Sequence, residues 1–153
     1  MTSVAALFST AWLLSIFTAP LLPTAISACV YAVGSLVCHQ LPDRSFHLGA
    51  YQLPVCARCV GIYCGAVVGA VAMMVPTGFS ARRMKETLIS RRARWMLMAA
   101  ALPTLTTVVL ETAGVWPATN GVRAAAGFPL GLVAALMVMS ALATINYRDQ
   151  IPR

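Results

Sequence analysis

The stretch that decides the fold is "GIYCGAVVG", which runs from Gly61 to Gly69. Its three glycines, Gly61, Gly65 and Gly69, stand four residues apart. In a helix this spacing places them on one face, where small residues let a second helix approach closely. Because the flanking residues are apolar, segment 59–75 predicts a membrane-spanning helix. We expect its glycine face to bind another helix.

The rest of the chain is as apolar as this segment. Of its 153 residues, 59% are hydrophobic and only 10% are charged. A soluble domain of this size has too little interior to bury that much apolar surface, whereas a lipid bilayer can cover it. The composition therefore predicts a single integral membrane domain over residues 1–153.

Hydropathy divides the chain into about four predicted spans. Between the first two, segment 24–37 would be about 21 Å long as a helix, whereas the hydrocarbon core is about 30 Å thick. We expect a short re-entrant or interfacial helix there, or a kinked continuation of the first span beyond Pro20 and Pro23. The predicted fold class is thus an all-α integral membrane bundle. Its spans are expected at about 4–22, 59–75, 95–115 and 122–145.

The net charge of +7 is concentrated beside the predicted spans. Six of the eleven Lys and Arg residues lie between Arg82 and Arg94. Basic residues in short membrane-flanking loops typically lie on the cytoplasmic side, so we expect a cytoplasmic connector over residues 80–94. Both termini would then be cytoplasmic and loop 38–58 extracytoplasmic, in a plasma membrane protein. This clustering argues against nucleic acid as a partner.

Loop 38–58 gathers side chains that bind metals. Cys38, His47, Cys56 and Cys59 read C-x8-H-x8-C-x2-C. A Cys-x2-Cys pair lets two thiolates bind one tetrahedral ion, and a third thiolate with one imidazole completes a set typical of structural zinc sites. His39 is an alternative to Cys38, since adjacent residues seldom both reach one metal. We predict a metal site here, with zinc first and another transition metal second.

The same thiols also suit redox chemistry. Extracytoplasmic thiols tend to oxidise, so a Cys56–Cys59 disulfide is an alternative to the metal. At the start of a helix, such a pair has its thiolate stabilised by the helix dipole, and Arg58 adds positive charge. A membrane thiol-disulfide oxidoreductase is therefore the second hypothesis. A third is a non-enzymatic scaffold or complex subunit, and the sequence leaves open whether the protein is an enzyme.

Further polar residues are expected near this loop. Glu111 is the only acid inside a predicted span, and acids in membrane helices are functional candidates by default. Asn120 and Arg123 begin the last span at the same end. One interpretation is structural, with Asn120 capping its helix and Arg123 pairing with Glu111. The other is a site wall that faces the cysteines. Arg44 and Arg58 are candidates for binding an anionic head group, although Arg44 also fits a simple turn.

Three motifs carry a family resemblance. "CHQLPDRSFHLG", "QLPVCARCVGIYCG" and "ATNGVR" resemble the signature of an uncharacterised bacterial and archaeal membrane family, domain of unknown function 2085. The resemblance extends from about Val37 to Gly131 and implies architecture and site location, but no activity. Because relatives often lack a histidine at the position of His47, it implies a ligand set with His39 instead. That set is Cys38, His39, Cys56 and Cys59.

Overall fold

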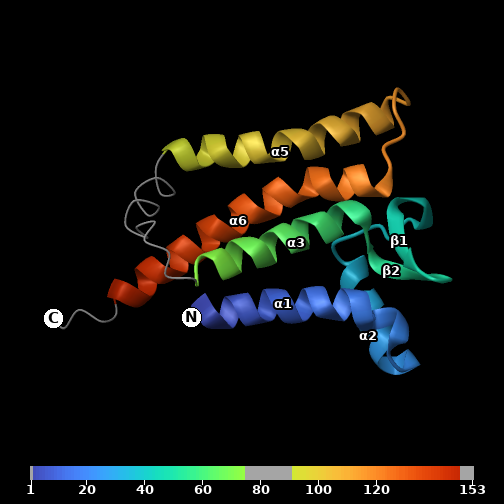
Figure 1. The fold of residues 1–153 in the computed structure, drawn as a ribbon, viewed down its shortest axis with the longest axis horizontal. Coiled ribbons are helices and arrows are strands. Elements are labelled where there is room, and N and C mark those ends of the chain that lie inside the picture. The colour runs from blue at the N-terminus through green and yellow to red at the C-terminus, as the bar shows by residue number, and fades with distance from the viewer. Residues whose placement is uncertain (1, 75–90, 149–153) are drawn as a thin grey trace.

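Four helices lie side by side in the computed structural model, which describes residues 2–74 and 91–148 (Figure 1). Across the view they follow the order α5, α6, α3, α1, so α3 lies between α1 and α6. The prediction of an all-α membrane bundle is therefore confirmed. The helices are α1 (Thr2–Thr18), α3 (Ala57–Ala72), α5 (Arg91–Thr112) and α6 (Asn120–Arg148).

Three of the described helical segments are long and apolar enough to cross a membrane. They are Thr2–Leu21, Ala93–Thr112 and Asn120–Ala143, which overlap three of the predicted spans. Helix α3 is apolar but has only 16 residues, and the predicted span 59–75 ends at a residue outside the described ones. The number of complete spans therefore stays a prediction.

The two ends of the bundle differ in content. The start of α1, the end of α3, the start of α5 and the end of α6 share one end (Figure 1). The opposite end carries the short helix α2 (Thr24–Ser35), a small β-hairpin and the turn between α5 and α6. Helix α2 matches the short helix expected from the sequence. Most of the predicted connector 80–94 lies outside the described residues, so its cytoplasmic placement stays a prediction.

The hairpin was not predicted from the sequence. After the 3₁₀ turn η2 (Pro42–Arg44), strand β1 (Ser45–Leu48) pairs antiparallel with β2 (Tyr51–Cys56). Its tip includes Gly49 at φ +62°, a conformation that glycine adopts without steric cost. The register places Ser45 opposite Cys56. Part of loop 38–58 is thus a β-hairpin, and its second strand ends at Cys56.

Helices α3 and α6 are in close backbone contact. A Cβ atom added to Gly61 would lie 1.9 Å from the carbonyl oxygen of Ala124. A Cβ on Gly131 would lie 1.8 Å from the carbonyl oxygen of Ile62. Only glycine permits such an approach. The expected glycine face of α3 therefore packs against a helix, and that helix is α6 of the same chain.

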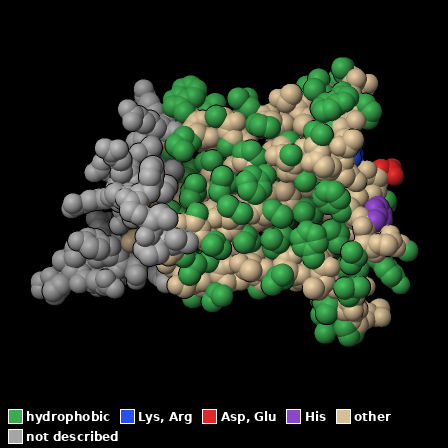
Figure 2. All heavy atoms as spheres, in the orientation of Figure 1, with side chains coloured by type: hydrophobic (Ala, Val, Ile, Leu, Met, Phe, Trp, Pro, Cys, Tyr) green, Lys and Arg blue, Asp and Glu red, His purple; other side chains and the backbone are tan. Residues whose placement is uncertain are grey.

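The flanks of the bundle are apolar. The space-filling view shows hydrophobic side chains along the helices, with visible acidic and histidine side chains only at the end that carries the hairpin (Figure 2). Phe8 on α1 is 73% exposed, and Val109 on α5 is 61% exposed. Exposed apolar area on this scale requires an apolar environment, which a bilayer supplies.

Candidate metal centre

Three thiols converge at the hairpin end of the bundle. The Sγ atoms of Cys38, Cys56 and Cys59 all lie within 4.8 Å of one another. Tetrahedral zinc with bonds of about 2.3 Å holds its sulfur ligands about 3.8 Å apart. The three sulfurs are therefore close to the separation that one ion requires.

Three different elements position these cysteines. Cys38 follows α2, and its N–H donates to the carbonyl oxygen of Gly34 at 3.0 Å. Cys56 is the last residue of β2 and the N-cap residue of α3. Cys59 lies in the first turn of α3. Because residues three apart share a helix face, Cys59 lies near Cys56, and the hairpin brings both to Cys38.

Two of the three sulfurs accept hydrogen bonds from their neighbours. The sulfur of Cys38 accepts backbone N–H bonds from Cys56 at 3.1 Å and from Gln40 at 3.5 Å. A hydrogen bond from the Cys59 thiol, opposed by burial, lowers the pKa of Cys56 to about 5. Cys56 is therefore ionised at neutral pH, and the thiolate is the form that binds metals and attacks disulfides.

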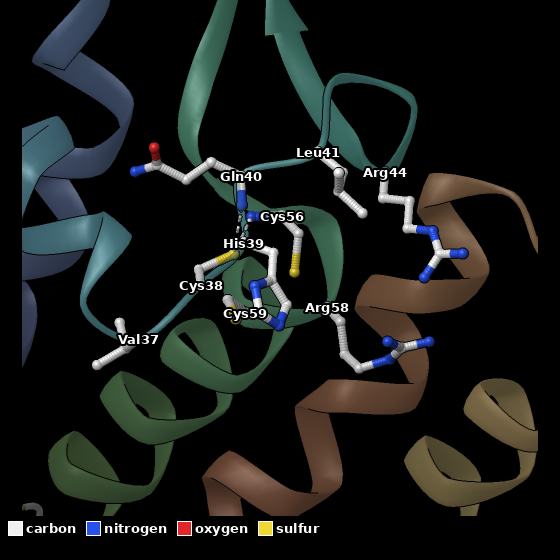
Figure 3. A pocket seen from close by; sticks show the side chains of 9 residues that line it. All are labelled: Val37, Cys38, His39, Gln40, Leu41, Arg44, Cys56, Arg58 and Cys59. Carbon is white, nitrogen blue, oxygen red and sulfur yellow. Dashed lines mark hydrogen bonds between the residues drawn. The ribbon is translucent and has the colours of Figure 1, made fainter. Parts of the chain in front are cut away.

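The two histidines lie in different places. His39 is exposed and lines the same cavity as the three cysteines (Figure 3). His47 is exposed on β1, opposite Gln52. Among the described residues, the group of donor atoms within 4.8 Å includes neither imidazole. Cys29 and Cys64 also lie outside that group, as free thiols on α2 and α3.

Two glutamines that sequence reasoning did not assign to the site hold the loop together. Gln40 has φ +50°, and its side-chain amide donates to the carbonyl oxygens of Tyr31 and Pro54, both at 2.7 Å. The amide of Gln52 donates to the Gln40 carbonyl at 2.6 Å. Gln40 thus ties the end of α2 to β2. The available signal was the presence of two amide side chains in a short loop of an apolar chain.

A buried ionic group lies beside the cysteines. The Glu111 side chain is 4% exposed, and its carboxylate accepts from Arg123 Nε at 2.8 Å and from Arg58 at 3.3 Å. Arg58 also donates to the Thr107 hydroxyl at 3.3 Å. The predicted pair of Arg123 with Glu111 is present, and Arg58 joins it. Two guanidinium groups offset the cost of a carboxylate at this depth.

Asn120 does not cap its helix, contrary to one of our predictions. The Thr119 hydroxyl accepts the N–H of Val122 at 3.4 Å, so Thr119 has the capping position. Asn120 is the first helical residue, and its amide instead donates to the carbonyl oxygen of Ser45 at 2.9 Å. Its own oxygen accepts from Arg123 at 2.7 Å. Since Ser45 on β1 pairs with Cys56 on β2, α6 supports the hairpin that carries a thiol.

Comparison with known proteins places the chain in a family. A model described as "Predicted membrane protein (DUF2085)" matches residues 38–137. The chain belongs to this family. The DUF2085 match begins at Cys38 and includes every candidate site residue, and the resemblance seen in the sequence is confirmed.

Two relatives of this DUF2085 protein are named only as uncharacterized proteins. An uncharacterized protein of Methanocaldococcus jannaschii is 32% identical over 123 residues, which cover 80% of this chain and 74% of the relative. Another, from Methanothermobacter thermautotrophicus, is 28% identical over 102 residues, covering 66% of this chain and 83% of the relative. No solved structure matches. The comparisons therefore support a membrane protein without assigning an activity.

Proposed function

We propose that this protein is a multi-pass membrane protein that binds one zinc ion through Cys38, Cys56 and Cys59. The observation that carries the proposal is the convergence of three thiols within 4.8 Å. Soft thiolate donors in a compact group select zinc over hard cations such as magnesium. The backbone N–H bonds to the Cys38 sulfur hold it in place beside the other two thiols.

The fourth ligand in this proposal is His39. Its imidazole adjoins the cavity of the cysteines, whereas His47 lies on the hairpin opposite Gln52. The His39 side chain is exposed, and in this proposal it turns toward the ion. The bound metal would link α2, β2 and α3, and so stabilise a loop that has little core of its own. Another transition metal with the same donor preference is an alternative occupant.

The site faces the extracytoplasmic side of the plasma membrane in this proposal. The support is the concentration of basic residues between Arg82 and Arg94 in the sequence. The described helix ends that this stretch follows and precedes, the end of α3 and the start of α5, lie at the end of the bundle opposite the cysteines. Both termini are then cytoplasmic. A second chain bound through Gly61, Gly65 and Gly69 is not part of the proposal, because α6 covers that face.

The test is the metal content of detergent-purified protein with reduced thiols. We expect about one zinc per chain in the wild type, and little in Cys56→Ser, because two thiolates and one imidazole hold the ion weakly. Cys29→Ser is the matched control, since Cys29 is exposed on α2 and lies outside the thiol group. A wild-type protein with reduced thiols and no metal would refute the proposal.

The second candidate function is thiol-disulfide exchange by Cys56 and Cys59. The lowered pKa of Cys56 and its hydrogen bond from Cys59 favour it. Oxidation of the pair, a Cys56 thiolate and a Cys59 thiol, to a disulfide would release one proton and two electrons. A membrane quinone can accept the two electrons together with that proton and a second proton from water. Acid trapping of thiols in cells, followed by mass spectrometry, separates the two functions. A pair that stays reduced and metal-bound under oxidative stress excludes the exchange function.

A further inference from the structure

The cavity beside the thiols has a basic side that the metal proposal does not use. Its volume is ≈ 190 Å³, and Arg44 and Arg58 line it together with the three cysteines and His39. Figure 3 shows both guanidinium groups on the side of the cavity away from the Cys38 sulfur. No carboxylate is among the residues that line it.

The two arginines retain unused hydrogen-bonding capacity. No hydrogen bond or ion pair joins the Arg44 side chain to another described residue. Arg44 is nevertheless partly buried. Arg58 donates to Glu111 and Thr107, yet its Nε is buried with no acceptor among the described residues. Buried and half-buried guanidinium groups without full partners are costly, and an added acceptor would lower that cost.

The charge balance also favours an anion. Glu111 carries one negative charge and contacts two guanidinium groups. The set of Glu111, Arg58 and Arg123 therefore keeps one net positive charge. Arg44 adds a second positive charge, and none of the described ion pairs joins it to its neighbour Asp43. A zinc ion with three thiolates would contribute one negative charge. With the metal bound, one positive charge therefore remains in excess among Arg44, the ionic group of Glu111 and the thiolates that line the cavity.

We propose that this cavity binds a phosphate-type oxyanion between Arg44 and Arg58. Guanidinium groups present paired N–H donors that match the oxygens of phosphate. The volume accommodates a phosphate group with a small substituent. This inference goes beyond zinc binding, because it depends on the two arginines and not on the metal.

Two sources supply the same chemistry. One is free phosphate or a small phosphorylated solute. The other is the head group of an anionic phospholipid, since the cavity lies at the end of the bundle, where the apolar flank of the helices gives way to polar side chains (Figure 2). Both sources place one phosphate between the same two guanidinium groups. The same protein variants therefore test both sources, with a different probe for each.

The first arm of the test measures binding of inorganic phosphate to the full-length, detergent-purified protein by calorimetry. We expect Arg44→Gln to weaken binding by about tenfold or more, since a charged hydrogen-bonding group is lost. Arg44 has no described partner, so this variant should fold as the wild type does. Arg94→Gln is the matched control, because Arg94 is an exposed residue near the start of α5, at the far end of the bundle.

The second arm reconstitutes the same variants in nanodiscs of phosphatidylcholine with phosphatidylglycerol and counts retained phosphatidylglycerol after extraction into detergent. Loss of retention in Arg44→Gln alone, without binding of free phosphate, assigns the site to the lipid. Loss of phosphate binding in Arg44→Gln alone assigns it to a solute. Equal behaviour of Arg44→Gln and Arg94→Gln in both arms overturns the proposal.

Zinc content measured on the same samples keeps the two proposals separate. We expect Arg44→Gln to retain the wild-type zinc content, because Arg44 supplies no metal ligand. Phosphate binding that depends on Arg44 in a zinc-free wild type would refute the zinc site and leave the anion site standing. Full zinc content with no Arg44-dependent binding in either arm would refute the anion site and leave the zinc site standing.

Discussion

The two halves of α3 are held by opposite kinds of contact. From Gly61 onward, α3 packs against α6 through backbone atoms so close that no Cβ fits between them. At its start, Arg58 and the adjoining hairpin are tied to α5 and α6 by charged groups and amide hydrogen bonds. The first kind of contact needs the absence of side chains, and the second needs particular ones. The close backbone contact between α3 and α6, here called the seam, therefore fixes the helix pair. The polar contacts at the start of α3 fix the site.

Removing the charge of Glu111 should have the largest effect. Glu111→Gln leaves Arg58 and Arg123 mostly buried without a counter-ion, and loss of one partner in such a group costs about 3–5 kcal/mol. Thermal unfolding in detergent, followed by circular dichroism, measures this cost. Asp43→Asn is the control, because it removes the same charge from an exposed position. Equal unfolding temperatures for the two variants would show that the ionic group does not stabilise the bundle.

Adding one methyl group to the seam should come next. Gly131→Ala would place a Cβ 1.8 Å from the carbonyl oxygen of Ile62, so the helices must separate. Overpacking of this kind costs about 1–3 kcal/mol, and we expect the upper part of that range because backbone atoms are involved. The same unfolding assay measures it. Gly121→Ala is the matched control, with its nearest neighbour atom, Thr119 Oγ1, 4.0 Å from the added carbon. A Gly131→Ala protein as stable as the control would contradict the close seam.

Loss of the link from α6 to the hairpin should have a smaller effect. Asn120→Asp keeps the oxygen that accepts from Arg123 but removes the N–H donor to Ser45. One lost hydrogen bond to a buried carbonyl costs about 1–2 kcal/mol. We also expect zinc to dissociate faster, because Ser45 pairs with Cys56. Chelator competition measures that rate, and an unchanged rate would show that α6 does not support the metal site.

Changing the two histidines should affect the metal and hardly the fold. Both side chains are exposed, so neither His39→Ala nor His47→Ala should lower the unfolding temperature of the metal-free protein. We expect His39→Ala to weaken zinc binding by about ten- to a hundredfold, a typical loss for an altered metal site, and His47→Ala to leave it unchanged. Zinc affinity measured with a competing chelator separates them, and the opposite ranking would make His47 the ligand.

The sequence predicted the seam better than it predicted the site. Glycines four residues apart on apolar helices have few structural meanings, and Gly61, Gly65 and Gly69 do face a helix. The Cys-x2-Cys pair likewise indicated where Cys56 and Cys59 would lie together. Both inferences rest on residues that are close in the chain, where helix geometry alone fixes the spacing.

What the sequence could not give were contacts between distant segments. The hairpin has strands of only four and six residues and an interior proline, Pro54, which weakens a strand signal. The role of Asn120 depends on where Ser45 lies, 75 residues earlier in the chain. The third member of the ionic group, Arg58, is 53 residues from Glu111. Such partners follow from the packing of α3, α5 and α6, which residue spacing does not encode.

The separation between Arg58 and Glu111 has a consequence for how the protein is made. A chain is synthesised from its N-terminus, so Arg58 and the three cysteines emerge before the carboxylate that neutralises Arg58 exists. Until α5 and α6 are inserted, the start of α3 carries an unpaired cation beside exposed thiols. The ionic group beside the thiols is therefore complete only when the last helix pair has been made. Truncation after α3 would leave Arg58 without Glu111.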